Sequence, residues 1–301
     1  MKQILQKIEE QDIGKVIQDA PLAKYTTYQV GGVARAIVYP KNTKKLIALL
    51  ELLKQQHILY RVLGNGSNTL FSDRPFEGII IKLDEFNDLE ITETKVVVGA
   101  GYPLMKLASQ VARKGLAGLE FASGIPGTVG GAIFMNAGAY KSDMGYVTSS
   151  VKVLTPDLKV IQLSNRELDF HYRTSFLQKH RDYICLEATL KLQRGDKDAL
   201  AQVNKERKLR RMESQPLEYP SAGSVFRNPE GLFAGKLIED LGLKGLFRGG
   251  AQISEKHANF IINRNQATAQ DIKDLIDFAK ETVKENYEVE LKVEQEFVNW
   301  E

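Results

Sequence analysis

The stretch GIPGTVGGA, residues 124–132, is followed closely by NAGAY, residues 136–140. Together they belong to a segment, Gly99 to Gly145, that contains 10 of the 24 glycines of the protein. Glycine permits tight turns and close approach of the backbone to a ligand, and a simple linker would not need so many. The segment therefore predicts a site in which backbone groups hold a bound molecule.

A second glycine-rich loop lies earlier in the sequence, in VLGNGSNTL, residues 62–70, directly after an apolar strand. Its successive N–H groups and short Ser, Asn and Thr side chains suit a pyrophosphate held by a backbone nest. A plain hairpin turn explains the same residues equally well. Neither glycine-rich loop matches the GxxxxGK[ST] or GxGxxG pattern, so the usual nucleotide-binding folds are disfavoured.

Composition describes an ordinary folded protein. It has 301 residues, of which 43% are hydrophobic and 26% charged, which allows two or three domains. A net charge of +3 is too small to indicate a nucleic-acid or membrane partner. The N-terminus lacks the features of a secretory signal, and no run approaches the roughly 20 apolar residues of a membrane span. We therefore expect a cytoplasmic protein.

Cysteine and histidine usage narrows the chemistry. The single cysteine, Cys185, lies in an alternating run, residues 183–187, which predicts a buried strand thiol and excludes an intramolecular disulfide. The four histidines are scattered without ligand spacing, so no metal centre is expected.

Hydrophobic periodicity predicts alternating helices and strands. We expect an N-terminal amphipathic helix that includes Ile4, Ile8 and Val16-Ile17, and a domain boundary near residues 217–220. Other predicted helices are 43–55 with Thr43 as its cap, 103–113, 197–214, 234–241, and one that starts at a capping box, Thr268 to Asp271. Predicted strands are 58–63, 78–83, 89–92, 95–101, 150–154, 159–163, 183–192 and 289–294.

Six motifs occur in order between about residues 24 and 295: GNGSN, GIPGTVGGAIFMNAGAY, YRTS, GSVFRNP, AGKLIEDLGLKG and AQISEKHANFI. In this combination the sequence resembles the UDP-N-acetylenolpyruvoylglucosamine reductase family, in its shorter subtype. These are flavoenzymes of peptidoglycan precursor synthesis, a process that serves cell-wall biogenesis, cell shape and cell division.

The resemblance implies an α/β (α+β) fold. Its FAD-binding part is of the vanillyl-alcohol-oxidase/PCMH type in two subdomains, and a C-terminal α/β domain binds the substrate. The implied segments are an N-terminal helical segment 1–24, an FAD-binding domain 25–195 with subdomains 25–90 and 91–195, a connecting helix 196–215, and a substrate-binding domain 216–301.

The resemblance also implies non-covalent FAD, with NADPH as the hydride-donating co-substrate. In the family, hydride passes from NADPH to the flavin and then, from flavin N5, to the enolpyruvyl ether of a UDP-sugar, giving UDP-N-acetylmuramate. The expected partners are therefore small molecules, with no nucleic acid and no membrane, and we expect a monomer. The residues implied to cradle FAD are Asn65, Gly66, Ser67, Asn68, Gly124, Ile125, Pro126, Gly127, Thr128, Val129, Gly131, Asn136, Ala137, Gly138 and Ala139.

Three residues match the catalytic positions of the family. Arg173 is a permanent cation with a bidentate fork, which suits a carboxylate that gains charge in the transition state. Ser224 matches the serine that protonates the enolate carbon, although a hydroxyl can act as an acid only where its surroundings support the alkoxide or replace the proton. Glu294 matches the C-terminal glutamate. Without the resemblance, Arg173 would be interpreted as a surface residue and Ser224 as a turn residue.

Several assignments remain open at this stage. Glu290, Glu294 and Glu296 share one face of an alternating strand, so strand phase does not choose among them. Arg248 stands one place later than the family arginine, and His257 has either a structural or a catalytic role. Residues implied to contact the substrate are Tyr172, Asn228 and Gln252.

Three alternatives compete with this hypothesis. The first is another flavin oxidoreductase of the same fold, such as a sugar or alcohol oxidase. The second is a nucleic-acid-binding protein that uses the basic run 205–211, but Glu206 interrupts the run and no aromatic residue is interleaved. The third is a relative that binds sugar nucleotides without turnover, which the presence of all three catalytic matches disfavours.

Overall fold

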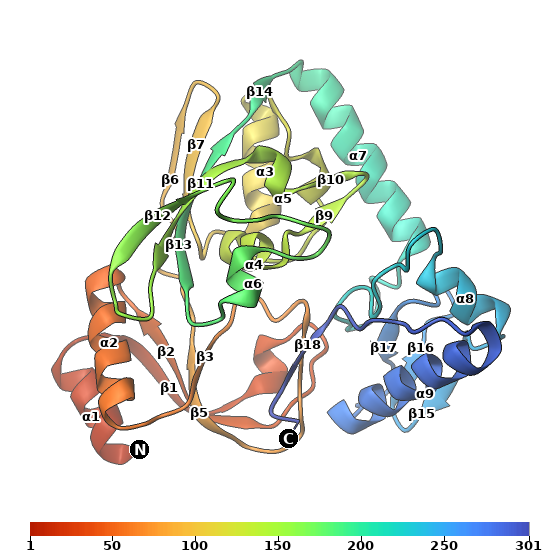
Figure 1. Ribbon diagram of the computed structural model, residues 1–301, viewed down its shortest axis with the longest axis horizontal. Helices are drawn as coiled ribbons and strands as arrows, with labels where there is room; N and C mark the ends of the chain where they lie inside the picture. Colours follow the sequence, from red (N-terminus) through yellow and green to blue (C-terminus); the bar gives the residue numbers. More distant parts are fainter. Residues whose placement is uncertain (301) are drawn as a thin grey trace. The chain divides into compact units, whose positions relative to one another are not determined.

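The computed structural model describes residues 1–300, which form two compact units, each with its own hydrophobic core (Figure 1). Unit 1 contains residues 1–18, 36–65 and 78–209. Unit 2 contains residues 19–35 and 66–77, and everything described from residue 210 onward. This division differs from the predicted sequential domains, because two early segments belong with the C-terminal third. Residue 301, the predicted end of the last domain, lies outside the described residues.

The N-terminal segment is a helix followed by a strand, not the helical segment predicted for residues 1–24. Helix α1 (Lys2–Glu10) ends because Asp12 adopts a left-handed φ of 49° and the N–H of Ile13 bonds back to the C=O of Ile8 at 3.0 Å. Val16 and Ile17, which were predicted to continue the helix, lie instead in strand β1 (Gly14–Pro21).

A four-stranded sheet has the order β1-β2-β5-β3, and the boundary between the units falls within β1, β2 and β5. Helix α2 (Thr43–Gln55) is confirmed, but its cap is Asn42 rather than Thr43, because the Asn42 side chain accepts the N–H of Lys45 at 3.1 Å. The other strands of this sheet are β2 (Val33–Pro40), β5 (Phe76–Ile81) and β3 (Tyr60–Val62).

The five-stranded sheet of unit 1 is antiparallel throughout, with the order β12-β11-β13-β7-β6 (Figure 1). It confirms the strands predicted in this part of the sequence. Cys185 lies in β13 and is buried, as predicted, and burial raises the pKa of its thiol to about 12. The strands are β12 (Val160–Ser164), β11 (Thr148–Leu154), β13 (Ile184–Lys191), β7 (Lys95–Gly99) and β6 (Leu89–Thr92).

The glycine-rich stretch 124–132 was predicted to form only irregular turns, but its second half begins a helix, α4 (Val129–Met135). Thr128 caps this helix by accepting the N–H of Gly131 at 3.2 Å, and Val129, Ala132 and Ile133 are buried, so packing outweighs the low helix propensity of glycine. The remaining elements of unit 1 are α3 (Leu104–Arg113), β8 (Leu116–Ala117), η2 (Glu120–Ala122), β9 (Gly138–Ala139), β10 (Ser142–Asp143), α5 (Met144–Val147), α6 (Phe176–Lys179) and β14 (Gln193–Arg194).

In unit 2, helix α9 (Ala269–Tyr287) packs on a three-stranded sheet of order β15-β16-β17 (Figure 1). The predicted capping box is confirmed, because the side chains of Thr268 and Asp271 each accept the backbone N–H of the other. The other elements are η1 (Leu22–Tyr25), β4 (Thr69–Phe71), α8 (Ala234–Asp240), β15 (Phe247–Arg248), β16 (Ala251–Ile253), β17 (Ile261–Asn263) and β18 (Glu296–Val298).

The prediction of a strand at 289–294 is wrong, because that segment makes only an isolated bridge between Val293 and Phe226. The strand lies further along, where β18 pairs in parallel with β4. Helix α7 (Lys197–Ser214) matches its prediction, and the boundary between the units falls within it. Across residues 1–300, no helix combines the length and apolarity needed to cross a membrane.

Candidate active site

The two glycine-rich stretches singled out in the sequence meet in unit 1. The Asn65 side-chain amide donates to the C=O of Pro126 at 3.0 Å, which joins residues 61 positions apart in sequence. A Cβ atom on Gly64 would lie 2.7 Å from Oγ1 of Thr128, so a larger residue at position 64 would have to displace this hydroxyl group. The two loops therefore form one structure.

Lys82 lies beneath this pair of loops and was not identified from the sequence. It is only 6% exposed, and its ammonium group donates to the C=O of Gly64 at 2.7 Å. The Asp84 carboxylate lies 3.4 Å from the same ammonium group. The only sequence signal was a lysine at the end of the apolar run GIIIK. The ammonium group therefore ties the Gly64 loop to the end of β5 and is paired with a carboxylate.

The loop 64–68 continues into unit 2. There, Gly66 has a φ of 62°, and a Cβ atom on it would lie 2.4 Å from the C=O of Tyr25. Asn68 donates from its side chain to the C=O of Glu294 at 3.1 Å. The predicted cofactor residues therefore divide between the units, with Asn65 in unit 1 and Gly66, Ser67 and Asn68 in unit 2.

Arg173 stands in a tight turn of unit 1. The turn closes through two backbone hydrogen bonds of 3.0 Å between His171 and Thr174, one in each direction. Arg173 itself has a left-handed φ of 55°, which costs an L-residue about 1 kcal/mol or more. Its guanidinium group donates to the C=O of Gly138 at 2.8 Å and lies 5.0 Å from the ring centre of Tyr172.

Asn136 connects this turn to the glycine-rich segment. It is 1% exposed, its amide donates to the C=O of His171 at 2.8 Å, and its side-chain oxygen accepts the N–H of Gly145 at 2.9 Å. Both ends of the side chain are therefore used within the protein. Its side chain holds the Arg173 turn in place, and the cofactor role of Asn136 stays a prediction.

Ser224 lies in unit 2, partly exposed, on an irregular segment between α7 and α8. The segment runs antiparallel to residues 292–294. The N–H of Glu294 donates to the C=O of Val225 at 2.8 Å, and the N–H of Arg227 donates to the C=O of Lys292 at 2.9 Å. The structure thus brings together the two segments that carry Ser224 and Glu294, which lie far apart in sequence.

These contacts distinguish the three candidate glutamates. Glu290 is exposed, with its carboxylate 3.9 Å from the ammonium group of Lys280. Glu296 belongs to β18 and pairs with Thr69. Of the three, only Glu294 is bonded through its backbone to the residue that follows Ser224, and its catalytic role stays a prediction.

The remaining predicted residues lie in varied surroundings. The Asn228 side chain accepts the N–H of Ala234 at 3.1 Å, and buried Gln252 donates to the C=O of Gly245 at 3.2 Å. Tyr172 is 53% exposed, and Arg248 is also exposed. The substrate contacts assigned to Tyr172, Asn228 and Gln252 stay predictions.

The surroundings of His257 support the structural alternative. Its Nδ1 accepts the N–H of Asn259 at 3.1 Å, so the neutral ring carries its proton on Nε2. Its own backbone N–H donates to Oγ of Ser254 at 3.3 Å. Burial lowers the pKa of the imidazole, which keeps the ring neutral near pH 7.

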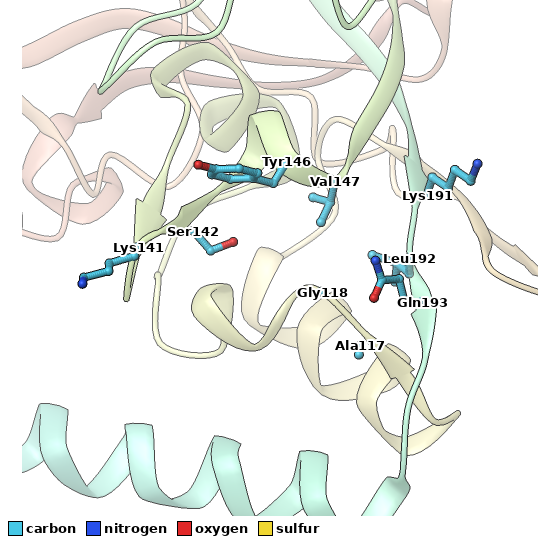
Figure 2. A pocket seen from close by; sticks show the side chains of 9 residues that line it. All are labelled: Ala117, Gly118, Lys141, Ser142, Tyr146, Val147, Lys191, Leu192 and Gln193. Carbon is cyan, nitrogen blue, oxygen red and sulfur yellow. The ribbon is translucent and has the colours of Figure 1, made fainter.

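A cavity of about 280 Å³ lies elsewhere in unit 1, and none of the predicted site residues lines it (Figure 2). Its walls include Lys141, Ser142, Tyr146 and Lys191. Figure 2 shows both lysine side chains pointing away from the cavity. The cavity therefore lacks convergent charge, whereas the two joined loops carry the buried Lys82.

Full-length relatives decide the family. The sequence is 47% identical over 299 residues to UDP-N-acetylenolpyruvoylglucosamine reductase 1 of Bacillus cereus, and the match covers 99% of both proteins. The chain belongs to the UDP-N-acetylenolpyruvoylglucosamine reductase family. The enzyme of that name from Bacillus subtilis is 44% identical over the same length and coverage.

Solved structures and family descriptions agree with this membership. The crystal structure of the reductase from Thermus caldophilus has a TM-score of 0.79 and 36% identity, covering 94% of this chain and 98% of that one. Residues 215–298 match the C-terminal domain described for UDP-N-acetylenolpyruvoylglucosamine reductase, and residues 34–164 match the description "FAD binding domain".

A more distant solved structure shares part of the fold. Phl p 4.0202, a glucose dehydrogenase, has a TM-score of 0.50 at 11% identity, covering 65% of this chain and 44% of that one, which shows a likeness of fold alone. The implied fold class, mixed α/β with an FAD-binding part of the vanillyl-alcohol-oxidase/PCMH type, is confirmed.

Proposed function

We propose that this protein catalyses the NADPH-dependent reduction of the enolpyruvyl ether of UDP-N-acetylglucosamine enolpyruvate to UDP-N-acetylmuramate, as a cytoplasmic enzyme of peptidoglycan precursor synthesis. The observation that carries the proposal is a full-length match to reductases of that name at 42–47% identity. Arg173, Ser224 and Glu294 are all present in the positions implied by the sequence.

The residues of unit 1 fit the diphosphate of FAD. Within residues 1–300, the backbone N–H groups of Asn65 and Gly127 have no protein acceptor, and both flank the contact between the two loops. Lys82 adds a positive charge at the C=O of Gly64. FAD, when bound, supplies the two-electron chemistry that links NADPH to the double bond.

Arg173 would hold the carboxylate of the enolpyruvyl group. Hydride addition to the terminal alkene carbon places negative charge on the adjacent carbon and its carboxylate, and a guanidinium group stabilises that charge through two parallel hydrogen bonds. The closed turn and the bond to Gly138 limit the positions that this guanidinium can occupy. Such preorganisation avoids reorganisation during the reaction.

Ser224 would deliver its hydroxyl proton to the carbon that bears the carboxylate. This leaves an alkoxide on Oγ, which must be reprotonated before the next turnover. Glu294 would position or polarise the enolpyruvyl group, as its backbone hydrogen bond to the Ser224 segment permits.

The absorbance spectrum of the purified protein tests the proposal. We expect a flavin band that NADPH bleaches and that the enolpyruvyl UDP-sugar restores without oxygen. A flavin that an alcohol or a sugar bleaches, but NADPH does not, would overturn the proposal in favour of an oxidase of the same fold.

A further inference from the structure

Asn259, between β16 and β17, clamps the segment that carries Ser224. It is 4% exposed. Its side-chain oxygen accepts the N–H of Phe226 at 2.9 Å, and its side-chain amide donates to the C=O of Phe226 at 2.8 Å. Its backbone carbonyl also accepts the N–H of Val225 at 2.9 Å. Three hydrogen bonds from one residue therefore fix the two residues that follow Ser224.

The residues on both sides of Ser224 set the position of its side chain, and Asn259 binds those on the C-terminal side. On the N-terminal side, Gly223 has a φ of 74°, and a Cβ atom built on it would meet nothing within 4 Å. The residue before it, Ala222, is 1% exposed, and its C=O accepts the side-chain amide of Gln295 at 3.2 Å, so the segment is anchored on that side as well. On the C-terminal side, Phe226 is 2% exposed and is held by Asn259, while residues 292–294 bond Val225 and Arg227.

Asn259 is itself held by the turn around it. Its N–H donates to Nδ1 of His257 at 3.1 Å, and the N–H groups of Lys256 and His257 both donate to Oγ of Ser254, at 3.1 and 3.3 Å. The N–H of Ser254 in turn donates to the C=O of Phe260 at 2.8 Å. These hydrogen bonds within the turn 254–260 restrict the position of the Asn259 carboxamide beside Phe226.

We propose that Asn259 is a positioning residue for the proton-transfer step, acting through the backbone of Phe226 to set the hydroxyl of Ser224. The inference rests on the proposed function, since it assumes that Ser224 is the proton donor. The carboxamide carries its acceptor oxygen and its donor nitrogen on separate atoms, so it binds the N–H and the C=O of Phe226 at the same time. A small displacement of a proton donor lowers the rate strongly, because proton transfer requires hydrogen-bond distance.

The decisive comparison is between N259D and N263D. Aspartate keeps the shape and still accepts the N–H of Phe226, but it cannot donate to the Phe226 C=O when ionised. Asn263 provides a matched control, because it is also buried, donates to the C=O of Tyr28 at 3.1 Å and accepts the N–H of Ala267 at 2.8 Å.

Stopped-flow absorbance on each holoenzyme would measure the two half-reactions separately. For N259D we expect flavin reduction by NADPH within about twofold of wild type, and reoxidation by the enolpyruvyl UDP-sugar about 10- to 100-fold slower at saturating substrate. The solvent deuterium isotope effect on reoxidation should rise, because proton transfer becomes more rate-limiting. N263D should lose comparable thermal stability while keeping both half-reactions within about twofold of wild type.

Equal slowing of both half-reactions in N259D, an unchanged reoxidation rate, or the same split in N263D would overturn the inference. If N259D does not fold, the neutral variant N259S carries the same expected split and the same contrary outcomes. Failure of the proposed function is a separate result, because wild type itself would then not be reduced by NADPH or not be reoxidised by the enolpyruvyl UDP-sugar.

Discussion

The Arg173 turn and the Ser224 segment meet the same requirement in different ways. Each carries a predicted catalytic side chain on irregular backbone, and each is tied to the protein by a buried asparagine, Asn136 or Asn259. The Arg173 turn, however, closes on itself within four residues and uses a left-handed φ. The Ser224 segment does not close on itself and depends on its contacts with Asn259 and with residues 292–294.

The Arg173 turn therefore has a strained backbone, whereas the Ser224 segment is held by contacts with other parts of unit 2. In the Arg173 turn, the backbone stores conformational energy that the surrounding structure must offset. In the Ser224 segment, the contacts with residues 259 and 292–294 keep the backbone in place, and they form only when unit 2 is folded. We therefore expect substitutions at the two sites to have different effects on stability and on the two half-reactions.

The largest expected effect is that of Ser224→Ala. Loss of the proton donor should slow reoxidation by the enolpyruvyl UDP-sugar about 100- to 10,000-fold, while flavin reduction by NADPH stays within about twofold. Stopped-flow absorbance measures both rates, with Ser221→Ala as a nearby control that should change neither. If Ser224→Ala slows the two half-reactions equally, Ser224 is not specific to the reoxidation step, and its role as the proton donor is contradicted.

Arg173→Lys should have the next largest effect. A point charge replaces the fork, so we expect kcat/KM for the enolpyruvyl UDP-sugar to fall about 10- to 100-fold. Steady-state kinetics would measure it, with the exposed Arg166→Lys as the matched control. Unchanged kinetics in Arg173→Lys would place this arginine outside the site.

Glycine and alanine substitutions at Arg173 and at Ser224 would show which of the two has a strained backbone conformation. In urea unfolding, Arg173→Gly should have a free energy of unfolding about 1 kcal/mol higher than Arg173→Ala, because glycine adopts a left-handed φ without penalty. Ser224 has no positive φ, so Ser224→Gly should be less stable than Ser224→Ala. The same order of stability at both positions would contradict the assignment of strain to the Arg173 turn.

The smallest effect concerns acid stability and His257, which supports the Asn259 clamp. Burial lowers the pKa of this imidazole below its ordinary value of 6.5, so the unfolded chain takes up a proton more readily than the folded one. The free energy of unfolding should therefore fall as the pH drops below about 6.5. Urea unfolding at about pH 7.5 and about pH 5.5 should show a larger loss in wild type than in His257→Gln. An equal loss in both proteins would mean that another group accounts for the pH dependence.

The sequence predicted correctly those elements whose structure depends on residues nearby in the sequence. Helix α7, strand β6 and the capping box of α9 were predicted within their observed limits. The predictions failed for elements that form through contacts with residues far away in the sequence. Strand β1 forms only by pairing in a sheet, α4 forms because one face is buried despite its glycines, and residues 289–294 had the alternation of a strand but no partner strand.

The same limit applies to the candidate site. The resemblance supplied Arg173, Ser224 and Glu294, because motifs preserve residue types in order. The supporting residues were missed, since their roles depend on contacts such as that of Lys82 with Gly64, or of Asn259 with Phe226, 33 positions away. No local pattern of residues shows such a contact.

The pairing of β4 with β18 has a consequence for synthesis on the ribosome. Thr69–Phe71 form a parallel ladder with Glu296–Val298, and the indole N–H of Trp300 donates to the C=O of Leu70, 230 positions earlier. The nascent polypeptide must therefore expose β4 without its β18 partner until residues 296–298 emerge, while every segment of unit 1 is already available by residue 209. During translation this strand is the natural point for chaperone engagement or for mispairing with a neighbouring nascent polypeptide.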